Sequence, residues 1–408
     1  MKKKFFGFGL GAIQVGLYLY EAHRSGNYDG FTIAEVDSAL VDTIRKAGGL
    51  INVNIASSKG IFSASIPDVV VLNPNDVNDR KKILSALADA DEISTAVPSV
   101  DFYTRGGANS IAALLSEAVN PGKKQILYAS ENNNHAAEIL YEKMCTLGDA
   151  SKWTDLQILN TVIGKMSGVS TDADEIRSMG LKELCTGSAK AILVEEFNKI
   201  YISRITNGVK CGIPVFEEKG DLLPFEEAKL FGHNAVHSLL AYLAHRMGYS
   251  LMSEIPAEGM IYCAGRSAFK NEIGKALVKK YAHLNEPLFT DKGFGEYAEN
   301  LLERMINPYL RDRISRVCRD PLRKLSFSDR LIGAMRQSMN AGLNPACFAD
   351  GAYAALLFLA WENPDFCGIK EFNGRLGKSE VNGILDRIWK DEDSAEKGKV
   401  ADLVLKCV

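Results

Sequence analysis

The stretch FFGFGLGAIQVG, residues 5–16, has glycines at positions 7, 9, 11 and 16. A dinucleotide-binding turn needs a strand before it, a helix after it, and glycines that let the backbone approach a pyrophosphate. Gly7, Gly9 and Ala12 fit the pattern G-x-G-x-x-G/A in that order, between an apolar run and a helical pattern. The stretch therefore predicts a strand–turn–helix that could bind a dinucleotide.

A secretion signal is the other interpretation of this stretch, because three lysines at positions 2–4 precede its apolar residues. A signal also ends in a small-residue cleavage site. Here Glu21, His23 and Arg24 follow instead, without an A-x-A pattern. The eight cysteines are scattered and form no CxxC pair, which is typical of reduced thiols. We therefore expect a cytoplasmic protein.

The choice of cofactor depends on an acidic residue about 20 positions beyond the glycine turn, which accepts hydrogen bonds from the ribose hydroxyls. Glu35 has this place in the sequence IAEVD, with Asp37 as a fallback. A carboxylate there repels a 2′-phosphate, so NAD is favoured over NADP. The plainer alternative is an ordinary α/β turn with a surface glutamate.

The hydrophobic pattern changes along the chain. Strand-like runs rich in Val and Ile alternate with helical patterns in the first half, which indicates βαβ units and a mostly parallel sheet. These runs lie at 4–9, 31–37, 68–73, 92–99, 125–130 and 191–197, and the less regular stretch 51–80 suggests an antiparallel excursion. Long helical patterns follow from about residue 222. We predict an α/β fold, with a Rossmann-like NAD-binding domain in residues 1–200 and a mainly α-helical substrate-binding and catalytic domain in residues 201–408.

Composition narrows the classes of partner. A chain of 408 residues is long enough for two domains. Its net charge of −3, with both signs interspersed, gives no support to binding of nucleic acid or an anionic membrane. No apolar run approaches the roughly 18 residues of a spanning helix. We expect a small-molecule substrate, and the sequence leaves the oligomeric state open.

The candidate catalytic residues lie in AKLFGHNAVHSLLAYLAHRMG, residues 228–248. At about 100° per residue, Lys229, His233, Asn234 and His237 fall on one face of a helix, and apolar residues fall on the other. A buried lysine can act as a general base, an asparagine amide can hold a developing alkoxide, and a histidine can orient a hydroxyl. Oxidation of an alcohol without a metal needs these three functions.

Other roles for these side chains are open. A lysine on a helix face is usually solvated, and a histidine there usually satisfies a local hydrogen bond. His233 and His237 also have the i, i+4 spacing of a zinc pair. Asn234 occupies the place of the glutamate in the HExxH motif, and no clustered third ligand is evident. We therefore expect no metal.

A family resemblance follows from these residues. Lys229, Asn234 and His237 reproduce the K-x4-N-x2-H signature of the polyol-specific long-chain dehydrogenases, and residues 229–249 are similar to the corresponding segment of mannitol-1-phosphate 5-dehydrogenases. Further similar segments are ENNNH (131–135), LNTVIGKMSGV (159–169), VEEF (194–197) and RDPLRKLSFSDRLIG (319–333).

The resemblance implies a Rossmann-like domain, a helical domain and a cleft between them. It implies that Lys229 is the general base and that Asn234 and Asn132 hold the substrate oxygen. His237 would contact substrate hydroxyls. Gly7, Gly9, Ala12, Ile13 and Glu35 would bind the cofactor.

The resemblance also bears on the substrate. Within the family, DPLRKL (320–325) favours members that act on sugar phosphates, and Arg323 and Lys324 could hold the phosphate. Alternatively, this motif caps helices and pairs with acids such as Asp329. The chain departs from the family in having Ala12 at the position of the third glycine and Ile13 in place of a common arginine.

The expected activity is that of a metal-independent, NAD-dependent polyol-phosphate dehydrogenase. Its reaction would interconvert D-mannitol 1-phosphate and NAD⁺ with fructose 6-phosphate and NADH. One alternative is a mannitol 2-dehydrogenase or hexuronate reductase, which acts on a substrate without phosphate. Another is a non-catalytic NAD-binding sensor.

Overall fold

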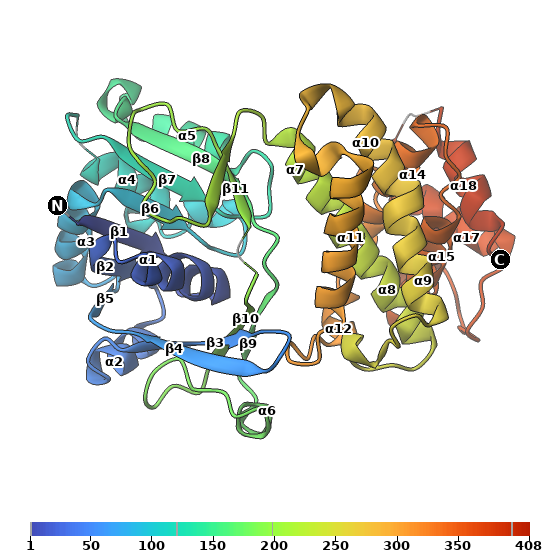
Figure 1. Cartoon of the computed structure of the whole chain (residues 1–408), viewed down its shortest axis with the longest axis horizontal. Helices are drawn as coiled ribbons and strands as arrows, with labels where there is room; N and C mark the ends of the chain where they lie inside the picture. Colours follow the sequence, from blue (N-terminus) through green and yellow to red (C-terminus); the bar gives the residue numbers. More distant parts are fainter. Residues whose placement is uncertain (1, 120, 198, 393–394) are drawn as a thin grey trace. The chain divides into compact units, whose positions relative to one another are not determined.

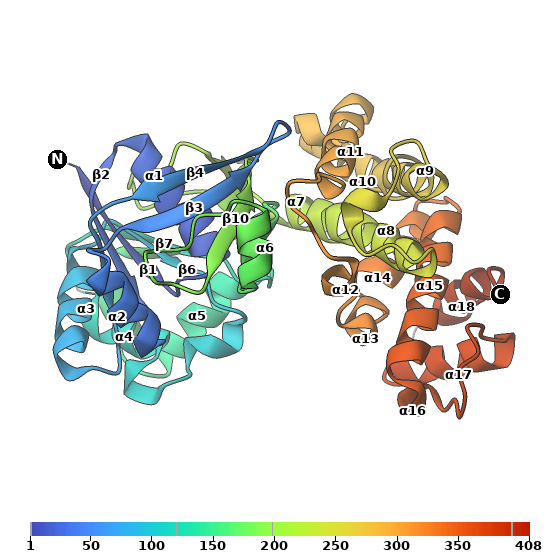
Figure 2. The same ribbon diagram turned by 90° about the horizontal axis from the view of Figure 1, so that it is seen from below.

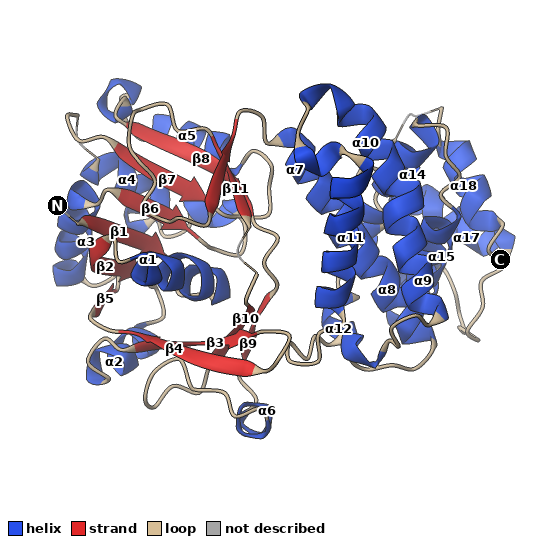
Figure 3. Ribbon diagram, in the orientation of Figure 1, coloured by secondary structure: helices blue, strands red, loops and turns tan. Residues whose placement is uncertain are grey.

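The computed structural model describes residues 2–119, 121–197, 199–392 and 395–408. The chain divides into two compact units, Met1–Leu223 and Pro224–Val408, and each is described by itself (Figure 1). Among the described residues every strand lies in the first unit, while the second is built of helices (Figure 3). The predicted fold class is thus confirmed. The first unit extends past residue 200, because two later strands join its sheet.

The first unit contains twelve strands, whose bounds are β1 Lys3–Phe8, β2 Tyr28–Ala34, β3 Ile51–Ala56, β4 Ile61–Ile66, β5 Val69–Leu72, β6 Glu92–Thr95, β7 Gln125–Ala129, β8 Leu156–Val162, β9 Ser167–Ser170, β10 Ala191–Glu195, β11 Ile200–Ser203 and β12 Phe216–Lys219 among the described residues. Its longer helical segments are η1 Gln14–Leu19, a π-helix, and α1 Tyr20–Ser25, α2 Ser38–Lys46, α3 Val77–Asp89, α4 Ile111–Ala118, α5 Ala136–Cys145 and α6 Ala173–Ser178.

The main sheet has the strand order β12-β11-β8-β7-β6-β1-β2-β5. Neighbouring strands from β8 to β5 are parallel, and β11 is antiparallel to β8. The strand order reverses at β1, which lies between β2 and β6. In open α/β sheets, ligands bind outside the carboxyl ends of the strands at such a switch point.

Side chains of β1 alternate between two hydrophobic cores, as a strand buried on both faces requires. Phe6 and Phe8 pack with residues of α3, α4 and α5, whereas Phe5 packs with residues of η1 and α2. Figure 2 shows β3 and β4 on the side of the main sheet opposite α4 and α5. The apolar β1 run of the quoted stretch therefore lies at the centre of the first unit.

A second sheet, not predicted from the sequence, has the order β4-β3-β10-β9. Its β3–β4 hairpin is antiparallel, which confirms the expected excursion in 51–80. Strand β10 corresponds to the predicted run at 191–197, but it pairs with β3 and β9 rather than joining the main sheet. Helix η1 packs directly on this sheet, because Gly16 has no side chain where it meets Val194 of β10.

The second unit has longer helical segments at α7 Leu223–Glu227, η5 Ala228–Asn234, α8 Ala235–Arg246, α9 Met260–Ser267, η7 Ala268–Gly274, α10 Lys275–Tyr281, α11 Asp291–Met305, α12 Ile314–Val317, α13 Pro321–Lys324, α14 Arg330–Asn340, α15 Ala346–Glu362, α16 Pro364–Cys367, α17 Lys378–Ile388 and α18 Lys397–Leu405. Helix α8 packs against α9, α12, α14 and α15 (Figure 2). The predicted catalytic residue His237 therefore lies on a helix that is packed by four other helices. None of the helices in the described part of the chain is both long and apolar enough to cross a membrane.

The Gly16→Ala substitution should destabilise the first unit by about 1–3 kcal/mol, because the added methyl group overlaps Val194 in a closely packed core. Urea unfolding of the full chain measures this change. Gly168→Ala is the matched control, since its added methyl group meets no atom within 4 Å. Equal stability of the two variants would contradict the close packing of η1 on the second sheet.

Candidate active site

The first group of candidate residues lies at the carboxyl edge of the main sheet. Strands β1, β2, β6 and β7 end in register there: Phe8 is paired with Ala34 and Thr95, and Thr95 is paired with Ala129. Since these strands are parallel, the turns that follow them share one edge of the sheet. The glycine turn, the acid after β2 and the asparagine after β7 are therefore brought to the same edge.

Gly9 gives the first turn its shape. Its φ of +83° is a backbone conformation that favours glycine. A Cβ atom on Gly9 would lie 3.1 Å from the carbonyl oxygen of Ala96, in the loop after β6. The Gly9 N–H donates to the carbonyl of Ala34 at 2.9 Å. The loops after β1, β2 and β6 thus approach one another closely around Gly9.

The helix after this turn begins at Ala12 and continues through Ile13 into η1. Gly7 lies against the buried side chain of Gln14, which a Cβ atom on Gly7 would overlap. A turn with closely approaching backbone, followed directly by a helix N-terminus, is the arrangement that binds a pyrophosphate. The residues of this edge therefore fit a dinucleotide.

Glu35 and Asp37 have different roles. The partly exposed Glu35 carboxylate accepts hydrogen bonds from the backbone N–H groups of Leu10 and Asp37, both at 2.9 Å. Asp37, the fallback acid, accepts a bond from the N–H of Leu40 as the N-cap of α2 and lies 3.4 Å from the Lys190 amine. Glu35 is thus the acid that lies against the glycine turn.

Asn132 is exposed in the loop after β7. Its neighbour Glu131 is buried and accepts hydrogen bonds from the Thr95 hydroxyl at 2.8 Å, the Val97 N–H at 3.0 Å and the Tyr103 hydroxyl. This carboxylate joins the ends of β6 and β7 and so supports the loop that presents Asn132. The sequence motif ENNNH contained Glu131, but only the structure shows this role.

The second group lies on η5 and α8. The segment 228–248 was predicted as one α-helix, but its first part, Ala228–Asn234, is a π-helix. In an α-helix Lys229 and Asn234 point about 140° apart. A π-helix pairs residue i with residue i+5, which brings Asn234 toward the side of Lys229. Such π turns are frequent at functional sites.

Two neighbouring elements hold this π turn in place. The ring of Phe269 on η7 lies against Gly232, where a Cβ atom would come within 2.8 Å of it. Phe231 packs against Gly333 of α14. Because close-packed interiors resist displacement, these contacts restrict the position of the backbone that carries Lys229.

The Lys229 amine has unusual electrostatics. Its pKa is lowered from 10.5 to about 8, mainly by burial and also by the positive charge of Arg330, while Glu226 opposes the shift. Arg330 begins α14, and its own side chain is only 11% exposed, with Nε 2.8 Å from a carboxylate oxygen of Asp329. Arg330 lies in the motif RDPLRKLSFSDRLIG, but its place beside Lys229 depends on a contact between distant parts of the chain.

The two histidines differ in their surroundings. Burial holds the pKa of His233 well below its usual range, with a further contribution from the charge of Arg304, so this ring is neutral near pH 7. His237 has its Nε2 3.1 Å from Oδ2 of Asp312, a residue the sequence did not single out. The His233 and His237 rings lie 6.2 Å apart. No group of three or more His, Cys, Asp and Glu side chains in the described residues could hold a metal ion.

Lys324, predicted to hold a phosphate, is buried. Its amine donates hydrogen bonds to the carbonyl oxygens of Val317 and Arg319. Burial lowers its pKa to about 8, so the amine is less strongly charged than a surface lysine. These contacts favour the alternative given above, in which the motif stabilises helix ends between α12 and α13.

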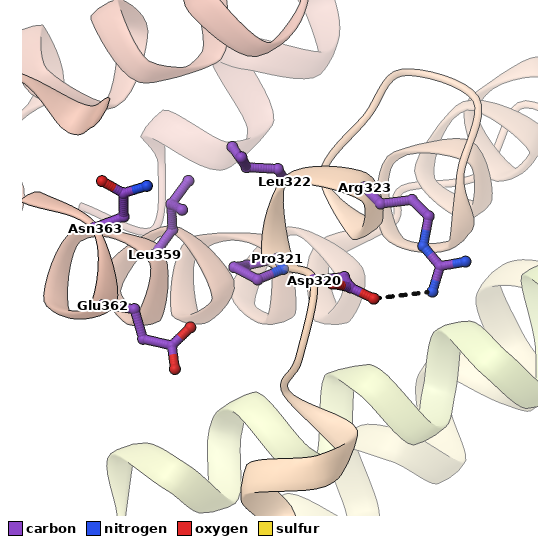
Figure 4. A pocket seen from close by; sticks show the side chains of 7 residues that line it. All are labelled: Asp320, Pro321, Leu322, Arg323, Leu359, Glu362 and Asn363. Carbon is purple, nitrogen blue, oxygen red and sulfur yellow. Dashed lines mark ion pairs between the residues drawn. The ribbon is translucent and has the colours of Figure 1, made fainter. Parts of the chain in front are cut away.

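Arg323, the other predicted phosphate contact, is exposed beside a pocket of about 710 Å³ (Figure 4). The pocket is lined by Asp320, Pro321, Leu322, Arg323, Leu359, Glu362 and Asn363. The Arg323 guanidinium lies 3.7 Å from the Asp320 carboxylate. A phosphate there would meet one guanidinium and two carboxylates, which is weak support for anion binding.

The predicted residues thus form two clusters. Gly7, Gly9, Ala12, Ile13, Glu35 and Asn132 share the carboxyl edge of the main sheet in the first unit. Lys229, Asn234 and His237 lie on consecutive turns of η5 and α8 in the second unit. A Rossmann-like unit followed by a helical unit that carries a lysine with a pKa of about 8 is the arrangement expected of a two-domain oxidoreductase.

Relatives narrow this class. Residues 221–364 match the mannitol dehydrogenase C-terminal domain. Over 393 residues the chain is 28% identical to a mannitol-1-phosphate 5-dehydrogenase of Caldanaerobacter subterraneus subsp. tengcongensis, covering 96% of this chain and 95% of the relative. It is also 26% identical over 419 residues to the enzyme of that name from an Exiguobacterium species, covering 99% and 96%.

Two solved structures share the fold. One is D-sorbitol dehydrogenase in substrate-free form, with a TM-score of 0.77 and 12% identity over 100% of this chain and 92% of that chain. The other is Pseudomonas fluorescens mannitol 2-dehydrogenase in complex with NAD and D-mannitol, with a TM-score of 0.68 and 14% identity over 100% and 91%. The resemblance to the mannitol dehydrogenase family is confirmed by the matching domain and the relatives that span nearly the whole chain.

The Lys229→Met substitution should stabilise the folded protein near pH 7 by up to about 3 kcal/mol, at about 1.36 kcal/mol per unit of pKa change. Lys229 binds its proton more weakly in the folded than in the unfolded chain. Its destabilising effect is therefore complete below pH 8 and disappears as the pH rises to about 10.5.

Chemical unfolding at several pH values measures this difference. Lys292→Met serves as the control, because that side chain is 86% exposed. If Lys229→Met and Lys292→Met changed the free energy of unfolding by the same amount at every pH, the Lys229 amine would be solvated.

Proposed function

We propose that this protein is a metal-independent, NAD-dependent polyol-phosphate dehydrogenase that interconverts D-mannitol 1-phosphate and fructose 6-phosphate. The observation that carries the proposal is the Lys229 amine, whose pKa of about 8 suits a general base near neutral pH. Similarity to mannitol-1-phosphate 5-dehydrogenases over nearly the whole chain supports the choice of substrate.

The chain's own residues supply the proton transfer and the orientation of the substrate. Lys229 accepts the proton of the alcohol as the carbonyl forms. The side-chain amides of Asn132 and Asn234 donate hydrogen bonds to the reacting oxygen, which stabilises its developing negative charge. His237 positions neighbouring hydroxyl groups of the substrate.

NAD⁺, when bound, supplies the acceptor for the hydride that leaves the alcohol carbon. The glycine turn with Gly7, Gly9, Ala12 and Ile13 would hold the pyrophosphate. Glu35 would accept bonds from the ribose hydroxyls, because its carboxylate has lone pairs beyond those used by Leu10 and Asp37. The same carboxylate disfavours the 2′-phosphate of NADP.

A substrate without phosphate is the second candidate, in a mannitol 2-dehydrogenase or hexuronate reductase activity. Two observations favour it: Lys324 is buried against carbonyl groups, and the pocket beside Arg323 has two carboxylates. The fold is also that of a mannitol 2-dehydrogenase. Arg323 is the phosphate contact that we retain for testing.

We also propose that the enzyme works in the cytoplasm. Its eight cysteines are all free thiols, and disulfides are rare in that compartment.

Replacing Lys229 with alanine should lower kcat for polyol-phosphate oxidation by about 10²- to 10⁴-fold, the usual range for loss of a general base. NADH formation followed by absorbance measures the rate. Lys292→Ala is the control and should retain full activity, since its side chain is exposed. An active Lys229→Ala variant would eliminate Lys229 as the base.

Comparing mannitol 1-phosphate with mannitol at equal concentrations tests the substrate. We expect a higher kcat/KM for the phosphate ester, and Arg323→Ala should raise the KM of the ester alone. Faster turnover of mannitol or a hexuronate would establish the second candidate. Binding of NADH without turnover of any of these compounds would identify a cofactor sensor instead.

A further inference from the structure

His237 and Asp312 form a buried pair in the second unit. Nε2 of His237 lies 3.1 Å from Oδ2 of Asp312, and their side chains are 12% and 5% exposed. Within the part of the chain that the structure describes, neither atom makes a well-aligned hydrogen bond, whether to the other or to a third group. Buried polar atoms are almost always hydrogen-bonded in folded proteins, and at 3.1 Å a small rotation of the imidazole ring completes a bond between these two.

Asp312 is itself fixed on its other side. Its Oδ1 accepts a hydrogen bond from Nε of Arg316 at 2.8 Å. The same oxygen lies 2.7 Å from Nη2 of Arg316. Its backbone carbonyl accepts a bond from the N–H of Met252 at 2.9 Å, and the next residue, Arg313, is bridged to Leu251. Oδ1 and the backbone are therefore engaged, which leaves Oδ2 for His237.

The charge state of Asp312 determines which nitrogen of His237 carries a proton. Burial alone would raise the pKa of Asp312, but its contacts with His237 and Arg316 outweigh burial and lower it. An ionised carboxylate only accepts hydrogen bonds, so the facing Nε2 must be the donor. In a neutral imidazole the opposite nitrogen, Nδ1, is then an acceptor.

We infer that Asp312, held by Arg316, is a positioning residue that keeps His237 in the Nε2–H form and so makes Nδ1 the acceptor for a hydroxyl group of the substrate. The choice of a hydroxyl as ligand rests on the proposed function. The tautomer itself does not, since it follows from contacts within the second unit. Without Asp312 the imidazole would be able to exchange tautomers and to rotate about its side-chain bonds.

The ¹⁵N NMR spectrum of the histidine side chains in the apo protein tests the tautomer directly. The chain has six histidines, and loss of one signal in His237→Gln assigns the signal of interest. In the wild type, Nε2 of His237 should carry the proton. In Asp312→Asn, which keeps the shape and removes the charge, we expect mixed tautomers of His237. An unchanged His237 signal would overturn the inference.

Activity provides the second readout. We expect Asp312→Asn to lower kcat/KM for the polyol by about 10- to 100-fold, as for other misplaced catalytic groups, while the KM for NAD stays unchanged. Asp386→Asn is the matched control, because it removes an exposed carboxylate that lies 3.8 Å from the Lys397 amine. Full activity of the Asp312 variant together with loss of activity in His237→Gln would contradict the inference.

Arg316→Gln covers the case in which Asp312→Asn fails to fold. The Arg316 side chain is 44% exposed and should tolerate the change, yet Oδ1 of Asp312 loses its partner. The His237 signal should then shift in the same direction, and an unshifted signal would overturn the inference. Wild-type protein that oxidises no polyol would refute the proposed function, and the NMR result would still decide the role of Asp312.

Discussion

A partly buried lysine amine, with a pKa lowered by burial and by a second cation, is the constraint on which the helical unit depends. Lys229 loses hydration, and the Arg330 charge disfavours its protonated form. The unit holds this unfavourable arrangement through packing: Phe269 and Gly333 fix the π turn, and α8 continues from it between α9, α12, α14 and α15. Local rules of stability are most often violated at functional sites, where the rest of the fold compensates.

The first unit meets a different requirement, the close approach of backbone segments at the edge where we propose that the cofactor binds. Gly9 allows the loops after β1, β2 and β6 to converge, and the carboxylates of Glu35 and Glu131 tie these loops to one another. In the proposed mechanism, cofactor binding depends mainly on backbone geometry, whereas proton transfer in the second unit depends on Lys229, whose pKa is lowered. The two units therefore divide cofactor binding and proton transfer between them in the proposed mechanism.

Local sequence patterns predicted those parts of the structure that depend on local interactions. The β1–turn–helix around Gly9, the acid at Glu35 and the Lys229–His237 segment all lie within short, readable motifs. Contacts between distant residues were not predictable in this way. The second sheet depends on pairing of β10 with β3, the Asp312 contact with His237 joins α8 to a later loop, and Lys324 is buried because Val317 and Arg319 present carbonyl groups to it. The π turn was missed because a helical pattern does not distinguish a π turn from an α turn.

The central claim is that the pKa of the Lys229 amine is lowered toward neutral pH, and direct titration of that amine is the sharpest measurement. The ¹³Cε signals of labelled lysines in the apo protein, with Lys229 assigned by its loss in Lys229→Met, report each amine's protonation. The account predicts that the Lys229 signal titrates with a pKa of about 8. A midpoint near 10.5, with the solvent-exposed lysines, would contradict it.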